Sequence, residues 1–401
     1  MHAVHIYESR KSRRTRSGAK MKAMILAAGK GTRVQPLTYE LPKPMIPLAG
    51  KPVMAYLIEH LARHGVGEIM VNVAHLHQKI EDYFGDGQQY GVQIGYSFEG
   101  YSTSDGRIVP KPLGSAGGMK KIQEFSGFFD TTTIVLCGDA AIDLDITAAL
   151  AEHRAKGAIA TVITKEVPWN KVSSYGIVIT DGDGRITSFQ EKPPREAALS
   201  NCASTGIYIF EPEALDLIPP GVEFDIGSQL FPLMVEKGLP FYAQTCRFNW
   251  VDIGTVADYW AVTQSILTGE VAGLELPGRE IAPGVFSGLN TCIEWEGTVI
   301  EGPVYIGTGT HIEAGAHIVG PCWIGSGCRV LSGAQVTRSV IFDYTRVSRT
   351  AELSELIVFR DYCVDRQGKI SHCDDFSNLW GNARDRRARN RDSAASVRAV
   401  M

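Results

Sequence analysis

The sequence predicts an α/β protein in which a Rossmann-like domain, built on a mixed and mostly parallel sheet, is followed by a left-handed parallel β-helix of hexapeptide repeats. Strand-like apolar runs alternate with helical patterns through the first part of the chain, and strands joined by crossover helices form a mostly parallel sheet. After about residue 270 an aliphatic residue instead recurs at every sixth position, which is typical of a left-handed β-helix. A chain of 401 residues, 44% of them hydrophobic, is long enough for two such domains.

The change of pattern divides the chain into four parts. Residues 1–20 are rich in Arg and Lys and lack an apolar core, so we expect a disordered basic extension or a misassigned start; a nucleic-acid or membrane arm is the lesser alternative. The α/β domain is expected over residues 21–270 and the β-helix over residues 281–370. Residues 371–401, which are Arg-rich toward their end, are expected to form a polar tail.

The elements of the first domain follow from hydrophobic periodicity. Strands are expected near residues 24–26, 68–74, 92–98, 132–136 and 158–164, and helices near residues 52–64, 119–125 and 146–156. Turn residues at 181–184 predict a hairpin that joins residues 176–179 to 185–189. Because ligands bind at the carboxyl ends of parallel strands, a site is expected in the loops that follow them.

The repeat of the second domain predicts which side chains point into the β-helix. The series runs through Ile300, Ile306, Ile312, Ile318, Ile324, Val330 and Val336 and, after a slip of one residue, through Ile341, Val347, Leu353 and Phe359. Three hexapeptides make one coil, so the run supplies roughly three to four coils. Such a β-helix offers flat faces for a second subunit, and a homo-oligomer is expected.

Composition excludes several classes of function. A net charge of −4 argues against a nucleic-acid partner, and no apolar run is long enough to span a membrane. Eight cysteines without a Cys-x-x-Cys pair favour reduced thiols in the cytoplasm and give no zinc spacing. His75 and His77 form a possible metal pair but fit better as the polar end of a strand.

The segment after the first strand has the pattern of a phosphate-binding loop. Gly29 and Gly31 let backbone amides approach an anion closely, and Arg33 and Lys43 bring cationic groups to the same place. A P-loop needs four residues between its glycines, and a dinucleotide-binding loop needs a third glycine where Val34 lies. Both are excluded, which leaves an ordinary strand-to-helix turn as the alternative.

Several motifs along the chain resemble, in order, those of the sugar-1-phosphate nucleotidyltransferases, also called nucleotide-sugar pyrophosphorylases. The resemblance extends over residues 22 to 265. The motifs are Ala27 to Thr38 with the Pro42-Lys43-Pro44 arm, Leu113 to Gly118, Leu136-Cys137-Gly138-Asp139, Phe189 to Pro193, Ser204 to Tyr208 and Trp250 to Thr255. Each motif is modest alone, but their common order is specific.

The resemblance implies a role for each matching residue. Nucleotide-binding positions are Leu26, Ala27, Ala28, Gly29, Gly31, Thr32, Arg33, Lys43, Gly114, Ala116 and Gly117. Sugar-phosphate-binding positions are Gly176, Glu191, Lys192, Ser204 and Thr205, and the metal ligands are Asp139 and Asp252. Arg33, Lys43, Asp139, Lys192 and Asp252 are the implied catalytic set. The family usually has Asn where Ser204 stands, which leaves that hydrogen bond open.

The implied reaction is attack of a hexose-1-phosphate on the α-phosphorus of a nucleoside triphosphate, with release of pyrophosphate. Two anions must meet, so the site needs cations, and Mg²⁺ prefers oxygen ligands such as two carboxylates. Each assignment has an alternative: Asp139 as a helix cap, Asp252 as a turn residue and Lys192 as a solvated loop lysine.

The loop Ser115-Ala116-Gly117-Gly118 and the short β-helix resemble mannose-1-phosphate guanylyltransferases, which implies GTP and mannose-1-phosphate. A UTP:glucose-1-phosphate uridylyltransferase on the same scaffold is the alternative. A non-catalytic regulatory subunit would be expected to have lost one of the charged site residues, which are intact. Acyl transfer by the β-helix is disfavoured, because His311 and His317 have no acidic neighbour at a shared spacing.

Overall fold

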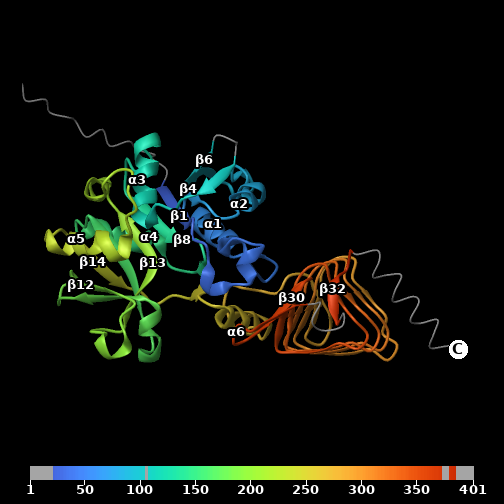
Figure 1. The fold of residues 1–401 in the computed structure, drawn as a ribbon. Coiled ribbons are helices and arrows are strands. Elements are labelled where there is room, and N and C mark those ends of the chain that lie inside the picture. The colour runs from blue at the N-terminus through green and yellow to red at the C-terminus, as the bar shows by residue number, and fades with distance from the viewer. Residues whose placement is uncertain (1–20, 104–106, 373–378, 385–401) are drawn as a thin grey trace, which may run out of the picture.

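The structure is a computed structural model that describes residues 21–103, 107–372 and 379–384. Figure 1 shows an α/β domain followed by a β-helix, with helix α6 between them. The expectations for residues 1–20 and for the end of the tail lie outside the described residues. Among the described residues, no helix is both long and apolar enough to cross a lipid bilayer.

A nine-stranded mixed sheet forms the centre of the first domain. Strands β5, β4, β1 and β8 are parallel neighbours, whereas β13 runs antiparallel to both β8 and β10. The predicted hairpin is confirmed as β11 and β12. The strands are β1 (Met21–Ala27), β4 (Val66–Val73), β5 (Gln93–Phe98), β8 (Thr133–Cys137), β10 (Ala160–Glu166), β11 (Gly176–Thr180), β12 (Ile186–Glu191), β13 (Cys202–Phe210) and β14 (Phe241–Thr245).

Helices cover both faces of this sheet (Figure 1). They are α1 (Val53–Arg63), α2 (His77–Phe84), α3 (Gly114–Ser126), α4 (Ile146–Ala155) and α5 (Phe231–Glu236), whereas α6 (Val256–Leu267) packs between the two domains. Three short strand pairs complete the domain: β2 (Pro47–Leu48) with β3 (Lys51–Pro52), β6 (Gly100–Ser102) with β7 (Ile108–Pro110), and β9 (Ala140–Ile142) with β15 (Trp250–Asp252).

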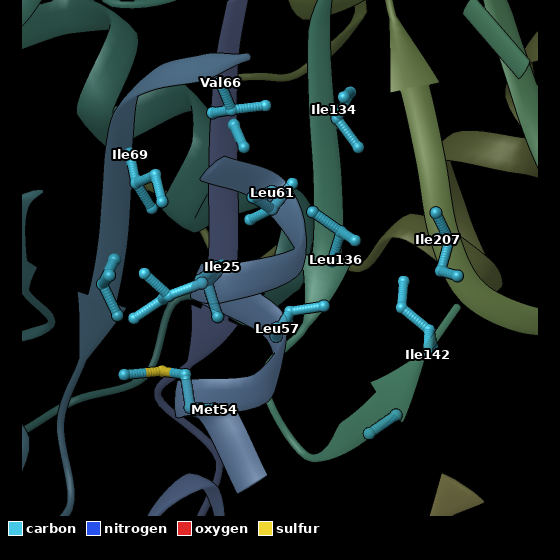
Figure 2. Packing of buried hydrophobic residues seen from close by; sticks show 14 of the residues in the cluster. Ile25, Met54, Leu57, Leu61, Val66, Ile69, Ile134, Leu136, Ile142 and Ile207 are labelled. Atoms are coloured by element: carbon cyan, nitrogen blue, oxygen red, sulfur yellow. The ribbon is translucent and has the colours of Figure 1, made fainter. Parts of the chain in front are cut away.

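The alternation of side chains along β1 explains the two cores. Ile25 packs under α1 against Leu57 and Leu136, as Figure 2 shows, while Met24 points to the opposite face and packs with Met119 of α3. Leu57 is almost fully buried, so its replacement by Ala should cost about 2–5 kcal/mol through lost burial and a cavity. This packing holds β1 and β8 side by side, and their carboxyl ends carry the loops of the site.

The second domain has three β-sheets in which successive coils pair in parallel, as predicted for a left-handed β-helix. The largest sheet contains β16 (Arg279–Ala282), β17 (Val285–Ser287), β20 (Val304–Ile306), β23 (Cys322–Ile324), β26 (Val340–Ile341), β29 (Leu356–Val358), β30 (Tyr362–Asp365) and β31 (Ile370–His372). The second contains β18 (Cys292–Ile293), β21 (His311–Ile312), β24 (Arg329–Val330), β27 (Thr345–Val347) and β32 (Trp380–Asn382). The third contains β19 (Val299–Glu301), β22 (His317–Val319), β25 (Gln335–Thr337) and β28 (Glu352–Ser354). Of these strands, β16, β30, β31 and β32 add antiparallel pairs.

The predicted inward series is confirmed up to Leu353 and wrong at its last member. Val358, not Phe359, enters the core of the β-helix, where it pairs with Ile341. The turn before it, at Glu355, is one residue shorter than the turn at Gly320 two coils earlier, so the register slips a second time. Phe359 therefore faces the first domain.

The boundary expected at residue 371 also needs correction. β31 and β32 both belong to the β-helix, and Trp380 is buried in its core. Trp380 was missed because it and Leu379 form only a short apolar pair, and its strand runs antiparallel to β27 outside the six-residue repeat.

The two domains share a third hydrophobic cluster. Side chains of the first domain, including Leu37 and Tyr259 of α6, pack against Trp323, Phe359 and Tyr362 of the β-helix. One sheet of the β-helix is therefore covered by the first domain of the same chain. Assembly of several chains through the remaining faces stays a prediction.

Candidate active site

The carboxyl ends of β1 and β8 bring the first two motifs together. The loop after β1 leads to Arg33, and β8 is followed by Gly138, whose amide donates to the carbonyl of Leu26 at 3.0 Å. The parallel pairing of Leu26 with Cys137 thus places Asp139 beside the glycine loop. This is the position at which ligands bind in open α/β sheets.

The glycine loop is held in shape by contacts that require Gly31. Its φ is +64°, and a Cβ there would lie 2.8 Å from Cγ2 of Thr38. The Thr38 hydroxyl in turn donates to the carbonyl of Gly31 at 2.9 Å. The loop then enters a short 3-10 helix, Thr32–Val34, from which the side chain of Arg33 is exposed.

Lys43 reaches Asp139 from the proline-rich arm. It begins a 3-10 helix, Lys43–Met45, directly after Pro42, and the prolines on either side restrict its backbone. The ammonium group of Lys43 forms a hydrogen-bonded ion pair with the carboxylate of Asp139. Both side chains are largely buried, so the pair is screened less by water than a surface pair.

The second carboxylate of the predicted metal site lies beside the first. β15 pairs with β9 so that Asp252 is opposite Ala140, and the amide of Ile253 donates to the carbonyl of Asp139 at 3.4 Å. Burial, together with the negative charge of Asp139, raises the pKa of Asp252 to about 6. Two carboxylates that disfavour each other's ionisation fit a divalent cation, which would stabilise both charges.

The sugar-side residues gather at the end of the β11–β12 hairpin. Gly176 is paired with Glu191 across the hairpin, and Lys192 follows at the end of β12. Lys192 has a φ of +45°, which is uncommon for a side-chain-bearing residue, and its amide donates to the carbonyl of Tyr175 at 3.2 Å. Its ammonium group pairs with Glu191.

A cavity of about 260 Å³ joins these groups. Its lining includes all of the predicted catalytic and sugar-side residues, together with the nucleotide position Leu26: Arg33, Lys43, Asp139, Gly176, Glu191, Lys192, Ser204, Thr205 and Asp252. The other nucleotide positions, Ala27, Ala28, Gly29, Gly31, Thr32, Gly114, Ala116 and Gly117, lie outside it. A larger cavity of about 950 Å³ between the domains contains none of the predicted site residues, so size alone does not locate the site.

The structure shows how the loop at Leu113–Gly118 is clamped. The amide of Phe224 donates to the carbonyl of Leu113 at 2.8 Å, and the amide of Gly117 donates back to Phe224 at 2.8 Å. Gly114 has a φ of +74°, and a Cβ there would lie 2.6 Å from the carbonyl oxygen of Phe224. Close approach of the two backbones therefore requires glycine at this position.

Two polar residues in the site were missed from the sequence. Asp225 accepts a hydrogen bond from the hydroxyl of Ser115 at 2.8 Å, and both line the cavity. Asp225 also caps the helical turn that follows it, accepting from the amides of Gly227 and Ser228. An Asp directly before an apolar helical run is an N-cap signal that was available in the sequence.

Asn72 and Glu99, which were also missed, hold the two predicted nucleotide-binding loops in place. Asn72 accepts a hydrogen bond from the amide of Ala27 at 2.8 Å and donates to Glu99 at 2.7 Å. Glu99 also accepts from the amide of Leu113 at 2.8 Å, which links the two predicted nucleotide loops. Burial raises the pKa of Glu99, whereas these hydrogen bonds favour its ionised form.

The two predicted residues of the sugar-side loop are partly engaged within the protein. The Ser204 hydroxyl lies 3.5 Å from the hydroxyl of Tyr208, and the Thr205 hydroxyl donates to the carbonyl of Ile163 at 2.8 Å. Both residues are buried. Ser204 faces the cavity with a shorter side chain than the Asn that is usual in the family.

The histidine alternatives can also be placed. His75 bonds to the carbonyl of Thr38 at 3.0 Å and His77 to Glu81 at 2.9 Å, so the pair does not converge on one point. Within the described residues, no group of three or more His, Cys, Asp or Glu side chains is arranged to hold a metal. A cation at Asp139 and Asp252 would therefore take its remaining ligands from phosphate oxygens and water.

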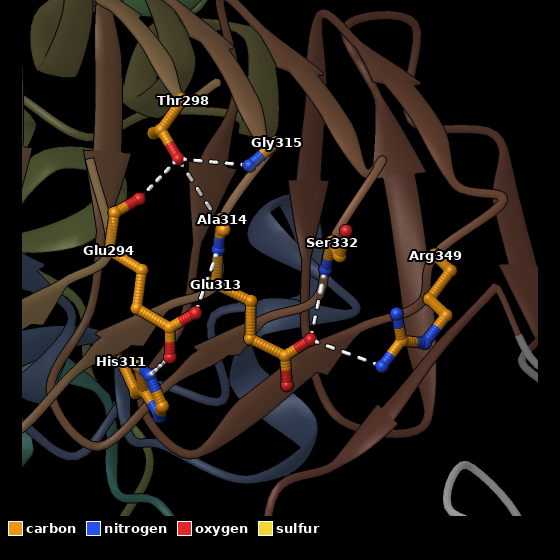
Figure 3. A network of polar contacts seen from close by, with 8 residues as sticks. All are labelled: Glu294, Thr298, His311, Glu313, Ala314, Gly315, Ser332 and Arg349. Carbon is orange, nitrogen blue, oxygen red and sulfur yellow. Dashed lines mark hydrogen bonds and ion pairs between the residues drawn. The ribbon is translucent and has the colours of Figure 1, made fainter. Parts of the chain in front are cut away.

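His311 has an acidic neighbour in space, although the sequence shows no nearby acidic residue at a spacing shared by His311 and His317. Its Nε2 lies 2.7 Å from Glu294 of the preceding coil, as Figure 3 shows. The other oxygen of Glu294 accepts from the amide of Ala314 at 3.1 Å. Hydrogen bonding to this amide and to His311 lowers the pKa of Glu294. Both carboxylate oxygens of Glu294 thus bond to the next coil, which fits a structural role in holding the two coils together.

Comparisons with known proteins show the family to which the chain belongs. Residues 22–269 match the nucleotidyl transferase family, and residues 297–374 match the GlmU-like C-terminal hexapeptide family. The chain therefore belongs to the nucleotidyl transferase family. Its motifs and its relatives place it among the sugar-1-phosphate nucleotidyltransferases.

Individual relatives narrow the comparison. A UTP–glucose-1-phosphate uridylyltransferase of Synechocystis sp. is 58% identical over 348 residues, which cover 87% of this chain and 89% of that protein. A mannose-1-phosphate guanylyltransferase of Mycobacterium tuberculosis is 29% identical over 300 residues, covering 74% and 77% of the two chains. A crystal structure from Bacillus anthracis, described as a glucose-1-phosphate thymidylyltransferase, shares the fold with a TM-score of 0.52 at 22% identity, over 61% of this chain and 94% of that one.

Proposed function

We propose that the protein is a UTP:glucose-1-phosphate uridylyltransferase. The observation that carries this choice is the 58% identity, over 87% of the chain, to a protein of that activity. The sequence motifs alone favoured GTP and mannose-1-phosphate, but the guanylyltransferase is only 29% identical. The comparison therefore favours the alternative over the first reading.

The proposed reaction is a single displacement. A phosphate oxygen of glucose-1-phosphate forms a bond to the α-phosphorus of UTP, the bond from that phosphorus to the bridging oxygen breaks, and pyrophosphate leaves with the electron pair. The attacking oxygen is already ionised, so the protein needs no nucleophilic side chain. Its contribution is to position two anions in line and to neutralise their charge.

The charged residues divide this work between the two substrates. Arg33 and Lys43 hold the triphosphate, and Arg33 also neutralises charge that develops on the leaving pyrophosphate. Lys192 holds the sugar phosphate, and Glu191, Gly176, Ser204 and Thr205, which line the same cavity, contact the sugar. The loops at Ala27–Thr32 and Gly114–Gly117 bind the nucleotide.

Asp139 and Asp252 are proposed to hold Mg²⁺, and their adjacency and the raised pKa of Asp252 support the fit. When bound, the ion supplies positive charge to the phosphate oxygens. Without nucleotide, Lys43 is paired with Asp139. When the nucleotide binds, the ammonium group of Lys43 pairs with the triphosphate instead.

The test is a matrix of substrates. Purified protein is incubated with Mg²⁺, one of four nucleoside triphosphates and either glucose-1-phosphate or mannose-1-phosphate, and pyrophosphate release is measured. The proposal expects UTP with glucose-1-phosphate to give the largest kcat/KM. A preference for GTP with mannose-1-phosphate would restore the first reading, and no release from any pair would favour a non-catalytic subunit.

A further inference from the structure

The segment between Arg33 and Lys43 is held from two sides. The first domain holds it through the Thr38 hydroxyl, which donates to Gly31 at 2.9 Å, and through His75, which bonds to the carbonyl of Thr38 at 3.0 Å. The second set of contacts comes from the carboxyl-terminal part of the β-helix, around β29 and β30. These contacts reach the segment close to both of its cationic residues.

The first β-helix contact lies three residues after Arg33. The hydroxyl of Tyr362 donates to the carbonyl of Pro36 at 2.9 Å in a buried position. The same carbonyl accepts from the amide of Tyr39 at 3.0 Å, so Tyr362 fills its second acceptor site. Burial and the nearby charge of Glu40 raise the pKa of Tyr362, so the hydroxyl stays protonated and able to donate.

The second contact lies three residues before Lys43. Arg360 forms an ion pair with Glu40, with 2.9 Å between Nη2 and Oε2. Both side chains are about one third exposed, so the pair should add little to stability. It does fix the distance between the turn after β29 and the backbone that leads to Lys43.

The part of the β-helix that makes these contacts is tightly packed. Arg360 lies in the tight turn between β29 and β30, and Tyr362 is the first residue of β30. The ring of Tyr362 stacks on Phe359 with centroids 4.6 Å apart, and Phe359 stacks on Phe342 at 3.9 Å. Leu37, between the two contacts, is fully buried in the same inter-domain cluster.

We infer that Tyr362 and Arg360 of the β-helix are positioning residues for the nucleotide site, which they serve by fixing the segment that carries Arg33 and Lys43. The inference rests on the proposed function, in which these two cations hold the triphosphate. The β-helix then completes the triphosphate site within one chain, whatever its role in assembly. The sugar side needs no such support, because Lys192 and Glu191 belong to a hairpin of the central sheet.

The test uses the full chain with Tyr362→Phe and Arg360→Met. Each variant should raise the KM for UTP by about threefold to tenfold, the effect of one lost hydrogen bond or ion pair on geometry, and leave the KM for glucose-1-phosphate unchanged. Calorimetric binding of UTP with Mg²⁺ should weaken by the same factor. Glu40→Gln should match Arg360→Met, and combining the two should add nothing further because they share one contact. Arg360→Lys should restore part of the affinity.

Arg366→Met is the matched control. Arg366 also reaches the first domain, where its guanidinium lies 5.1 Å from the ring centroid of Trp260 in α6. Its ion pair, at 3.1 Å, is with Glu355 of the β-helix and not with the segment at 33–43. Its replacement removes a partly exposed contact between the domains and should leave the KM for UTP unchanged. An unchanged UTP affinity in Tyr362→Phe and Arg360→Met, an equal rise for both substrates, or the same rise in Arg366→Met would each overturn the inference. Because UTP binding is measured without turnover, these outcomes are separate from a failure of the proposed reaction.

Discussion

The ammonium group of Lys43 is hydrogen-bonded to the carboxylate of Asp139, which lies 96 residues further along the chain. In this state an internal cation neutralises one of the two carboxylates that are proposed to hold Mg²⁺. A metal ion must compete with that cation for the same oxygen. In the proposed function the nucleotide would resolve this competition, because its triphosphate would offer Lys43 another anion.

Lys43→Met is therefore expected to change metal and nucleotide affinity in opposite directions. Without nucleotide, Mn²⁺ used as a probe should bind more tightly to the variant, by about tenfold, because the competing charge is gone. UTP should bind more weakly. Titration calorimetry with Mn²⁺ alone measures the first effect, and Lys51→Met, which removes a lysine paired with Glu59, is the control. Equal or weaker Mn²⁺ binding in Lys43→Met would show that the ion pair does not compete with metal.

Asp139→Asn and Asp252→Asn should each lower kcat by about a hundredfold or more, because each removes one negative ligand from the proposed metal site while keeping the shape of the side chain. Pyrophosphate release at saturating Mg²⁺ measures this, with circular dichroism to confirm folding. Asp216→Asn, a change at an exposed carboxylate outside the cavity, should be neutral. Near wild-type turnover in both site variants would exclude the two-carboxylate metal site.

Lys192→Met and Lys43→Met should separate the two substrates. Lys192→Met is expected to raise the KM for glucose-1-phosphate by about tenfold or more with a small effect on UTP, and Lys43→Met should do the reverse, because the two ammonium groups are placed on different anions. Initial rates with each substrate varied at saturation of the other distinguish the effects. Equal effects on both substrates would mean that the lysines are assigned to the wrong ends.

Gly114, the first residue of α3, and Gly127, which follows its last residue, can be compared by the same substitution to Ala. Gly114 and Gly127 both have positive φ, +74° and +65°, but only at Gly114 would a Cβ meet the backbone, whereas nothing lies within 4 Å at Gly127. Gly127→Ala should cost about 1 kcal/mol of unfolding free energy from backbone strain alone. Gly114→Ala should cost more and should also raise the KM for UTP, since it pushes the loop away from Phe224. Chemical denaturation and UTP kinetics measure both, and equal costs at the two positions would argue against the clamp.

Local pattern was sufficient for the parts of the site that lie on short motifs. Arg33, Lys43, Asp139, Lys192 and Asp252 each belong to a short motif that is visible in the sequence, and the structure brings all five to one cavity. The contact of Ser115 with Asp225 joins residues 110 apart, and that of Pro36 with Tyr362 joins residues 326 apart. Neither contact could be predicted from a local sequence pattern, because the two residues of each are too far apart in the chain. The inward position at Val358 was missed for a related reason, since one shorter turn changes the register of every residue after it.

The measurement that tests the account most directly follows the label in UTP whose α-phosphate is radioactive. With glucose-1-phosphate and Mg²⁺, the account predicts that the label passes entirely into the nucleotide-sugar, that unlabelled pyrophosphate is released in equal amount, and that no label remains on the denatured protein. Label in pyrophosphate would place the broken bond elsewhere, and label attached to the protein would require a nucleophilic side chain. Either result would contradict the proposed single displacement at the α-phosphorus.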